Sequence, residues 1–393
     1  MADAQSVITE TPPARPYSRR PPVSFNVYLL AAAVILALLA IFFVAPVVAW
    51  WSQAGPVRPG AFDRRMPLAA FFQEGAMNGF TVIWFFAVGA SFGSFMNVVT
   101  WRMPRGMNFV SQSSICPNCR HAIRGYHNLP VIGWLMLGGR CRDCDEPISF
   151  RYPLVEILFG GAAFLLCTLE LASGGWNLPL REPATRAGFY ETLWTPKWDI
   201  IFLFAFHFFL LVWLLTLALF EIDEEAPPRR FALFAIAIAL SITFICPVVH
   251  PVSWLLTETS AAKPFPLAPE RFSGLIGVIV GGIAALPAAL MSHDRRSYAM
   301  TLVLASSLIG AHLGWPAAVS AMVLTTILTL LIGKKTATVA TLTFATLIQI
   351  LAWRWLHHVQ WDFGFMGISA WILLVASALF LLPVRALLAE SAK

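Results

Sequence analysis

The sequence predicts an all-α polytopic membrane protein of about ten transmembrane helices, with a small cytoplasmic loop domain that binds zinc through four cysteines. Three observations predict this fold class. The 393 residues are 58% apolar and 12% charged, whereas a typical soluble domain has about 25% charged residues. The apolar residues fall into about ten runs close to the 20 residues that a helix needs to cross the hydrocarbon core. Four cysteines in two Cys-x-x-Cys pairs predict the loop domain.

The expected spans are apolar runs separated by polar or charged segments. They cover residues 26–50, 78–101, 154–172, 200–220, 231–256, 273–291, 299–314, 315–333, 338–357 and 366–385. The run from 299 to 333 is divided at Gly314-Trp315-Pro316, because proline does not continue a helix cleanly. The first span is too long for a removable signal peptide. We therefore expect an extra N-terminal transmembrane helix at 26–50, after a disordered cytoplasmic tail at 1–25.

Lysine and arginine concentrate in alternate loops, which predicts that these loops are cytoplasmic. The basic residues in question are Arg15, Arg19, Arg20, Arg102, Arg105, Arg120, Arg124, Arg140, Arg142, Arg151, Arg229, Arg230, Arg295, Arg296, Lys334, Lys335, Arg385 and Lys393. Both termini and the cysteine loop are then on the cytoplasmic side. The net charge of +6 is a topology signal, so we expect the lipid bilayer and no nucleic acid as a partner.

Four of the six cysteines, Cys116, Cys119, Cys141 and Cys144, form two Cys-x-x-Cys pairs with a 21-residue spacer. This spacing is typical of a closed tetrahedral site of four thiolates, for which zinc is the usual ion. A pair of disulfides is disfavoured in a reducing cytoplasm, and an iron–sulfur cluster also accepts four thiolates. Cys167 and Cys246 lie within or at the end of apolar runs and are expected to be packing residues.

The stretch from Gly89 to Glu156 carries a series of recognisable motifs. They are Gly93-Ser94-Phe95-Met96-Asn97-Val98-Val99, Arg102-Met103-Pro104, the two cysteine pairs, Asn128-Leu129-Pro130-Val131-Ile132-Gly133-Trp134, Gly139-Arg140-Cys141-Arg142 and Ile148-Ser149-Phe150-Arg151-Tyr152-Pro153-Leu154-Val155-Glu156. In these motifs the sequence resembles the type IV prepilin peptidases. One departure is His127, where the family usually has an acid.

The resemblance implies a bacterial inner-membrane protein related to aspartic endopeptidases. The family processes type IV pilin and type II secretion pseudopilin precursors and often N-methylates them, which implies S-adenosylmethionine as a cofactor. It also implies a domain division: an N-terminal peptidase domain at 78–156 with the zinc loop at 102–153, a helical membrane core at 157–333, and C-terminal transmembrane helices at 334–393.

The family's protease site needs two aspartates, because one carboxylate activates water while the other holds a proton. The resemblance places the first at Asp223, after Phe220-Glu221-Ile222. The second belongs to a Gly-x-Gly-Asp sequence eight residues before Gly310, and Leu302 stands there. The nearest acid is Asp294, about 12 Å too early along a helix at 1.5 Å per residue. The Gly-x-Gly-Asp motif is therefore missing.

Two functions remain open at this point. One is a member of the family without proteolytic activity, which serves as a structural or assembly subunit of a membrane complex. The other is an active prepilin leader peptidase and N-methyltransferase that acts on pilin-like precursors. The missing Gly-x-Gly-Asp motif favours the member without proteolytic activity, because the packing and metal-binding motifs are retained while the catalytic motif is not.

Several ionisable residues fall inside the expected spans and are functional candidates for that reason. They are His207, His312, His357 and His358. A pair of histidines on facing helices can ligate haem iron, although the chain has no Cys-x-x-Cys-His sequence. Glu156 and Glu170 are expected to anchor the third span at the two membrane interfaces.

Overall fold

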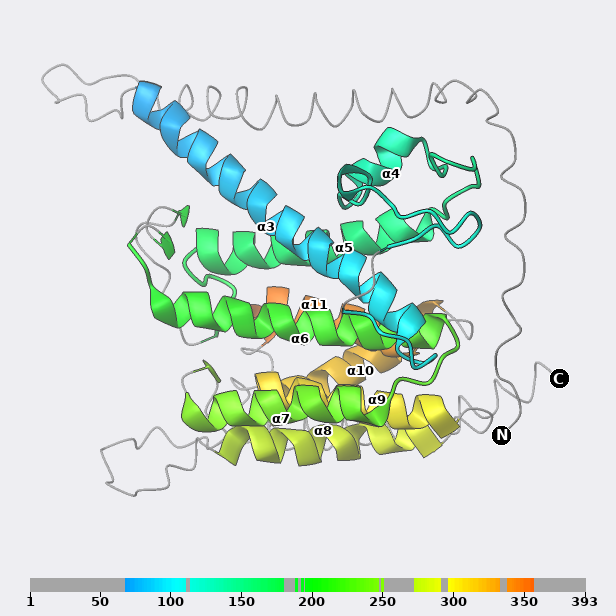
Figure 1. Ribbon diagram of the computed structural model, residues 1–393. Coiled ribbons are helices and arrows are strands. Elements are labelled where there is room, and N and C mark those ends of the chain that lie inside the picture. The colour runs from blue at the N-terminus through cyan, green and yellow to red at the C-terminus, as the bar shows by residue number, and fades with distance from the viewer. Residues whose placement is uncertain are drawn as a thin grey trace, which may run out of the picture.

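The computed structural model describes residues 68–110, 114–179, 188–189, 192–193, 195–246, 249–250, 272–290, 296–332 and 338–356. Within them the chain is a bundle of helices that run side by side, with a small irregular domain at one end (Figure 1). The predicted tail at 1–25, the helix at 26–50, the span at 366–385 and the pair His357 and His358 lie outside the described residues, as does Asp294.

Three helical segments are long and apolar enough to cross a membrane. The first is the inner part, Gly75–Arg102, of α3 (Leu68–Arg102). The second joins α5 (Arg151–Leu166) to the π-helical segment η3 (Cys167–Ala172), and the third is α6 (Trp198–Ile222). These three coincide with predicted spans and confirm a mostly helical protein with three candidate membrane spans. The larger count of about ten spans remains a prediction.

Five further helices complete the described part of the bundle. They are α7 (Arg229–Ile245), α8 (Ser273–Leu290), α9 (Arg296–Leu313), α10 (Trp315–Ile332) and α11 (Thr338–Leu351). The predicted break at Gly314 is confirmed: α9 ends just before this glycine and α10 begins just after it. Gly314 has a φ of +84°, a left-handed conformation that glycine adopts without steric cost.

Helix α6 lies at the centre and packs against α3, α5, α9 and α11. Aromatic rings fill the contact with α3, where Phe85 meets Phe204 with ring centroids 4.9 Å apart and Phe92 meets Phe208 at 5.4 Å. These edge-on pairs have the geometry that aromatic rings prefer. Helix α6 is thereby held on several sides, which fixes the direction in which its polar residues point.

Helices α8 and α9 approach each other so closely that their backbones touch. A Cβ atom added to Gly277 would lie 1.9 Å from the carbonyl oxygen of Gly310, and the reverse substitution gives the same distance. The hydroxyl of Ser306 crosses the same contact and donates to the carbonyl of Gly281 at 2.8 Å. Small residues with an interhelical hydrogen bond are typical of helix pairs in membranes.

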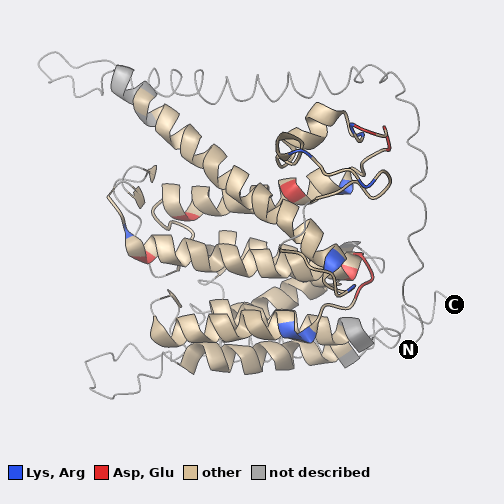
Figure 2. Cartoon of the chain, in the orientation of Figure 1, with Lys and Arg blue, Asp and Glu red and all other residues tan. Residues whose placement is uncertain are grey.

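Charged side chains are scarce along the helices and collect at one end of the bundle (Figure 2). At this end α3 finishes at Arg102, α5 begins at Arg151, α6 finishes beside Asp223 and α7 begins at Arg229. The loop between α3 and α5 lies at the same end. This loop contains a 3₁₀ turn, η2 (Gly125–His127), and the short helix α4 (Ile132–Leu137).

Candidate metal centre and the carboxylate end of α6

Two turns of similar conformation carry the four cysteines. In each pair the backbone N–H of the first cysteine donates to the carbonyl five residues later, at 3.0 Å in the first turn and 2.8 Å in the second. The residue after each second cysteine, Arg120 or Asp145, has a positive φ of 62° or 61°. Isolated β-bridges close both turns, one between Ile115 and Ala122 and one between Arg140 and Pro147. The two halves of the loop therefore present their thiols in the same way.

The four sulfur atoms converge on one point. All lie within 4.8 Å of one another, with 3.8 Å between Cys116 and Cys144 and 4.0 Å between Cys119 and Cys141. A tetrahedron of thiolates around zinc, with Zn–S bonds of about 2.3 Å, has S···S edges of about 3.8 Å. The S···S distances between the cysteines are about twice the length of a disulfide bond. They leave room for a single ion rather than for a multi-atom cluster. The residues present therefore fit one tetrahedral metal ion.

The thiols of this cluster influence one another's protonation. Burial raises the pKa of Cys119 to about 12 and also raises the pKa of Cys141. For Cys144 burial acts in the same direction, but hydrogen bonds from the backbone at Glu146 and from the other thiols outweigh it and lower the pKa. A metal ion must displace the thiol protons, so its binding tightens as the pH rises.

Hydrogen bonds hold the region of α4 both to α5 and to the rest of the loop. The carboxylate of Glu156 in α5 accepts the backbone N–H of Val131 at 2.6 Å, and Trp134 of α4 donates its indole N–H to the carbonyl of Ile148 at 3.0 Å. Glu156 is buried; it was expected to anchor the span at the membrane interface, and here it holds the loop. Gly133 is needed at its position, because a Cβ there would lie 2.1 Å from the carbonyl oxygen of His127.

Asp223 closes α6 at the charged end of the bundle. Its carboxylate accepts a hydrogen bond of 2.5 Å from the guanidinium of Arg151, the first residue of α5. Two residues further on, Glu225 pairs with Arg105 at 2.9 Å. Both arginines lie at the borders of the cysteine loop, one just after α3 and the other at the start of α5. The acidic end of α6 is thus linked to the loop on both sides.

Glu221 has a role that the sequence did not reveal. Its carboxylate accepts the backbone N–H groups of Thr338, Val339 and Ala340 at 2.9, 2.7 and 3.2 Å. These are the first N–H groups of α11, which have no partner within their own helix. The positive end of the helix dipole also favours a carboxylate there. Glu221 therefore joins the end of α6 to the start of α11.

The position that the resemblance gives to the second aspartate lies inside a helix. Leu302 is a buried residue of α9 and belongs to the apolar core. The alternative candidate, Asp294, is outside the described residues. Among the described contacts of Asp223, the charged partner is the guanidinium of Arg151. A second carboxylate beside Asp223 is not among the described interactions.

A second polar cluster is buried in the opposite half of the bundle. Glu170 and His207 are both 0% exposed, with 2.6 Å between Oε1 and Nδ1. The amide of Asn177 donates to the same carboxylate oxygen at 3.5 Å and to the carbonyl of Ile350 at 2.9 Å. Glu170 was expected to anchor the span at an interface, and the structure shows its carboxylate fully buried within the bundle. The π-helical segment contains Glu170, which lies in the core with a histidine of α6.

The two described histidines of the expected spans, His207 and His312, are packed among neighbouring side chains. The Nδ1 atom of His312 lies 3.0 Å from the carbonyl of Leu308 in its own helix, and the His312 ring stacks on Phe206 at 4.4 Å. Among the described residues, the four cysteines are the group of three or more ligands close enough to hold an ion. His207 and His312 are packed and hydrogen-bonded inside the bundle.

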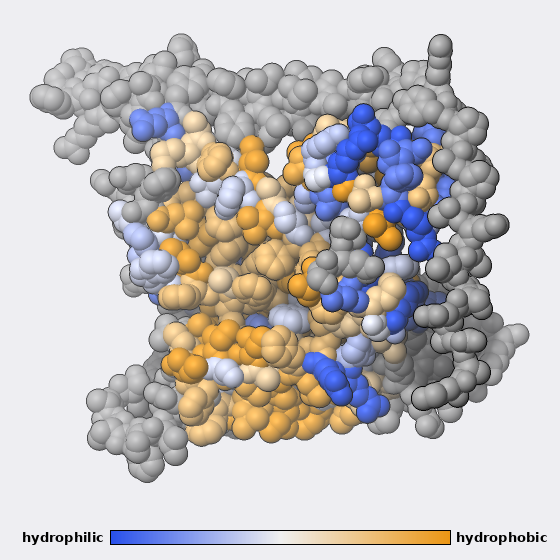
Figure 3. Space-filling view, in the orientation of Figure 1, coloured by the Kyte–Doolittle hydropathy of each residue, from blue (hydrophilic) through white to orange (hydrophobic). Residues whose placement is uncertain are grey.

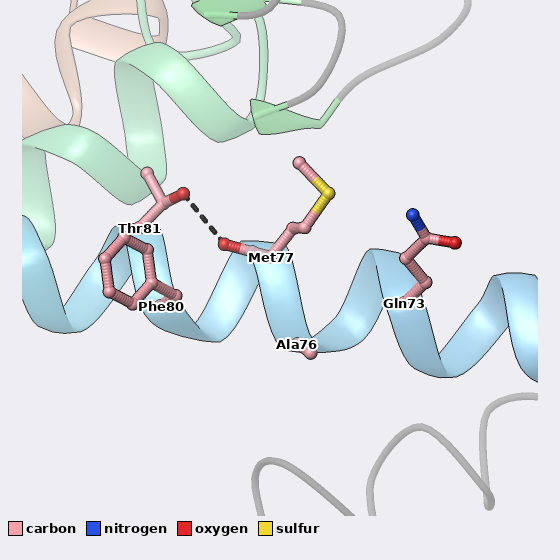
Figure 4. A pocket seen from close by; sticks show the side chains of 5 residues that line it. All are labelled: Gln73, Ala76, Met77, Phe80 and Thr81. Carbon is pink, nitrogen blue, oxygen red and sulfur yellow. Dashed lines mark hydrogen bonds between the residues drawn. The ribbon is translucent and has the colours of Figure 1, made fainter.

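A shallow hollow on α3 is not a candidate binding site. It is lined by Gln73, Ala76, Met77, Phe80 and Thr81 (Figure 4). These residues all come from one helix, and the hydrogen bond drawn there, from Thr81 to the carbonyl of Met77 at 2.8 Å, is internal to that helix. The lining has no charged group and no second element to enclose a ligand.

Comparison with known proteins identifies the segment that contains the loop. Residues 87–171 match the family model of the bacterial peptidase A24 N-terminal domain. A prepilin leader peptidase/N-methyltransferase of Myxococcus xanthus is 44% identical over 98 residues, which are 25% of this chain and 28% of the relative. A type 4 prepilin-like proteins leader peptide-processing enzyme of Escherichia coli is 44% identical over 108 residues, 23% of this chain and 40% of the relative.

A longer match extends beyond the domain. A prepilin leader peptidase/N-methyltransferase of Burkholderia pseudomallei is 32% identical over 178 residues, 33% of this chain and 56% of the relative. The chain thus spans between 28% and 56% of the length of these three relatives. The comparison with solved structures found no match.

Fold and site together define a helical membrane protein with a four-cysteine loop that can hold a metal ion. Residues 87–171 form a segment that matches the bacterial peptidase A24 N-terminal domain, and relatives that share it are named prepilin leader peptidase/N-methyltransferase. Its spanning helices and its relatives support a place in the inner membrane.

Proposed function

We propose that this protein is a member of the prepilin peptidase family that does not cleave peptides and acts as a structural or assembly subunit of a bacterial inner-membrane complex. The observation that carries the proposal is the state of the protease site. Aspartic proteolysis needs two carboxylates that share the roles of base and acid. Asp223 is bound to Arg151, and the position of its expected partner is the buried Leu302 in α9.

The four-cysteine loop has a structural part in this proposal. Zinc bound by Cys116, Cys119, Cys141 and Cys144 would have no open position for a substrate, and would supply a cross-link between the two turns rather than a reaction. Through Arg151 and Arg105 the loop would fix the acidic end of α6. The arginines at this end of the bundle support a cytoplasmic location for the loop and for both termini.

The second candidate function is an active prepilin leader peptidase and N-methyltransferase. The relatives that match residues around the loop carry that name, and this favours retention of a methyl-transfer activity that uses S-adenosylmethionine. Asp223 and Asp294 would then form the carboxylate pair. The substrates would be type IV pilin precursors or pseudopilin precursors of type II secretion.

A cleavage assay separates the two candidates. The full chain is expressed in cells that lack their own prepilin peptidase, together with a type IV pilin precursor, and the precursor N-terminus is analysed by mass spectrometry. The Myxococcus xanthus relative serves as the positive control. We expect an uncut precursor. A shortened pilin that disappears with Asp223→Asn would establish the second candidate, and a methylated N-terminus would establish the transferase activity.

The assembly role has its own test. The protein is extracted from native membranes in a mild detergent and its partners are identified by mass spectrometry, with a Cys141→Ser variant for comparison. We expect a defined set of co-purifying membrane subunits whose yield falls in the variant. A stable monomer with no co-purifying subunit would refute this role.

A further inference from the structure

Helix α4 of the cysteine loop is apolar on both of its sides. Its sequence, Ile-Gly-Trp-Leu-Met-Leu, contains no charged or hydrogen-bonding side chain other than the indole. Trp134 faces the loop interior, where it donates to the carbonyl of Ile148. Ile132 and Met136, four residues apart and therefore on one face of the helix, are each 55% exposed. Leu129, just before the helix, is 48% exposed.

The helix lies beside α5 rather than beyond its end (Figure 1). Val131, at the start of α4, donates to Glu156 of α5. Glu156 is five residues past the start of α5 at Arg151, about 7.5 Å along the axis at 1.5 Å per residue. The same stretch of α5 exposes Leu154 and Leu158, which are side chains for lipid if α5 crosses the membrane. The start of α4 is therefore level with the first lipid-facing turns of α5.

The residues before α4 supply the other groups that are found where a bilayer meets water. Tyr126 is 49% exposed, and tyrosine is enriched at this level of the membrane. The guanidinium of Arg124 is within 3.5 Å of the Tyr126 hydroxyl, and its ion pair with Asp143 is long, at 3.9 Å. An arginine in this setting can reach an anionic lipid headgroup. Figure 3 shows the corresponding pattern, with orange residues among the blue ones of the loop domain.

We propose that α4 and Leu129 form a membrane-docking surface that inserts into the interfacial layer of the leaflet on the loop's side of the bilayer. Ile132 and Met136 enter the boundary between headgroups and acyl chains, as the apolar face of an interfacial helix does. The hydrogen bonds of Trp134 and Val131 hold the opposite side to the loop and to α5. The partner is lipid, because the surface continues the lipid-facing side of α5 at the same depth.

This docking goes beyond the proposed function and does not depend on it. It assigns the loop domain a fixed position against the bilayer, which would be the same in an active peptidase and in an assembly subunit. A cleavage assay leaves the proposal unaffected.

The test uses the full chain in nanodiscs of phosphatidylethanolamine and phosphatidylglycerol. A photoreactive benzoylphenylalanine replaces Met136 in one variant and Ala122 in the other, and adducts are identified by mass spectrometry. Ala122 is the matched control, since it is exposed on the same loop but lies in the first cysteine turn. We expect a several-fold higher yield of lipid adduct from position 136 than from position 122.

Two results would overturn the proposal. One is an equal yield of lipid adduct from both positions, and the other is an adduct from position 136 to a second copy of the chain. A further variant, Ile132→Asp, carries the same probe at position 136 and is first checked for an unchanged melting temperature in detergent. Its lipid adduct is expected to fall several-fold, and an undiminished yield would count against docking.

Discussion

The contact between α8 and α9 gives a sharp test of the packing. In Gly310→Ala, the new Cβ would lie 1.9 Å from the carbonyl oxygen of Gly277 and 2.3 Å from its carbon, whereas ordinary contacts begin at 3.4 Å. The helices must therefore separate by about 1.5 Å, because the obstructing atoms are backbone and cannot rotate away. Overpacking of this kind costs about 1–3 kcal/mol.

A second loss adds to the first. If the helices separate, the hydrogen bond from Ser306 to the carbonyl of Gly281, now 2.8 Å long, is stretched, and such interhelical bonds contribute about 0.6 kcal/mol in membranes. Replacement of glycine by alanine within a helix returns about 1 kcal/mol of intrinsic helix propensity. We expect a net destabilisation of about 0.5–2.5 kcal/mol for Gly310→Ala.

The assay is unfolding in mixed micelles with increasing sodium dodecyl sulfate, followed by tryptophan fluorescence. The control is Gly161→Ala in α5, where an added Cβ meets nothing within 4 Å. Gly161→Ala is expected to be neutral or to stabilise by up to about 1 kcal/mol through helix propensity. If Gly310→Ala is as stable as Gly161→Ala, the close approach of α8 and α9 does not exist and the reasoning fails.

Three other perturbations have defined outcomes. Native mass spectrometry should detect one zinc ion per wild-type chain and none in Cys141→Ser. Acidification of the wild type should release the ion, because protons compete for the thiolates. Zinc retained by the variant would contradict the proposed set of ligands. Glu221→Ala should lower the free energy of unfolding by about 1–3 kcal/mol, because it leaves the first N–H groups of α11 without their acceptor. Glu225→Gln removes one partner of an exposed ion pair and should lower it by under about 1 kcal/mol. Equal losses in the two variants would refute the link between Glu221 and α11. Glu170→Gln and His207→Gln should each lower the free energy of unfolding. The double variant should lose less free energy than the sum of the two single losses. Additive losses would show that the two side chains do not interact.

The sequence alone was sufficient for the features that depend on a short stretch of chain. A run of apolar residues predicts a spanning helix because the bilayer thickness sets its length, and α3, α5 and α6 appear where such runs occur. The break at Gly314 was predicted because the preference of proline is local. The two Cys-x-x-Cys pairs predicted a shared site from spacing, and the structure brings their sulfur atoms within 4.8 Å.

Only the tertiary structure decided which polar groups meet inside the bundle. Glu170 and His207 are 37 residues apart, and Glu221 is 117 residues from its first N–H partner on α11. The pairing depends on how each helix is rotated and where a π-helical turn shifts the register, and neither follows from composition. The sequence was therefore sufficient to predict apolar helices long enough to cross a membrane, a loop of four cysteines that could hold a metal ion, and a departure from the family's second aspartate motif. The structure decided that the carboxylates at the end of α6 bind arginines and a helix start, because packing around α6 brings those groups to them.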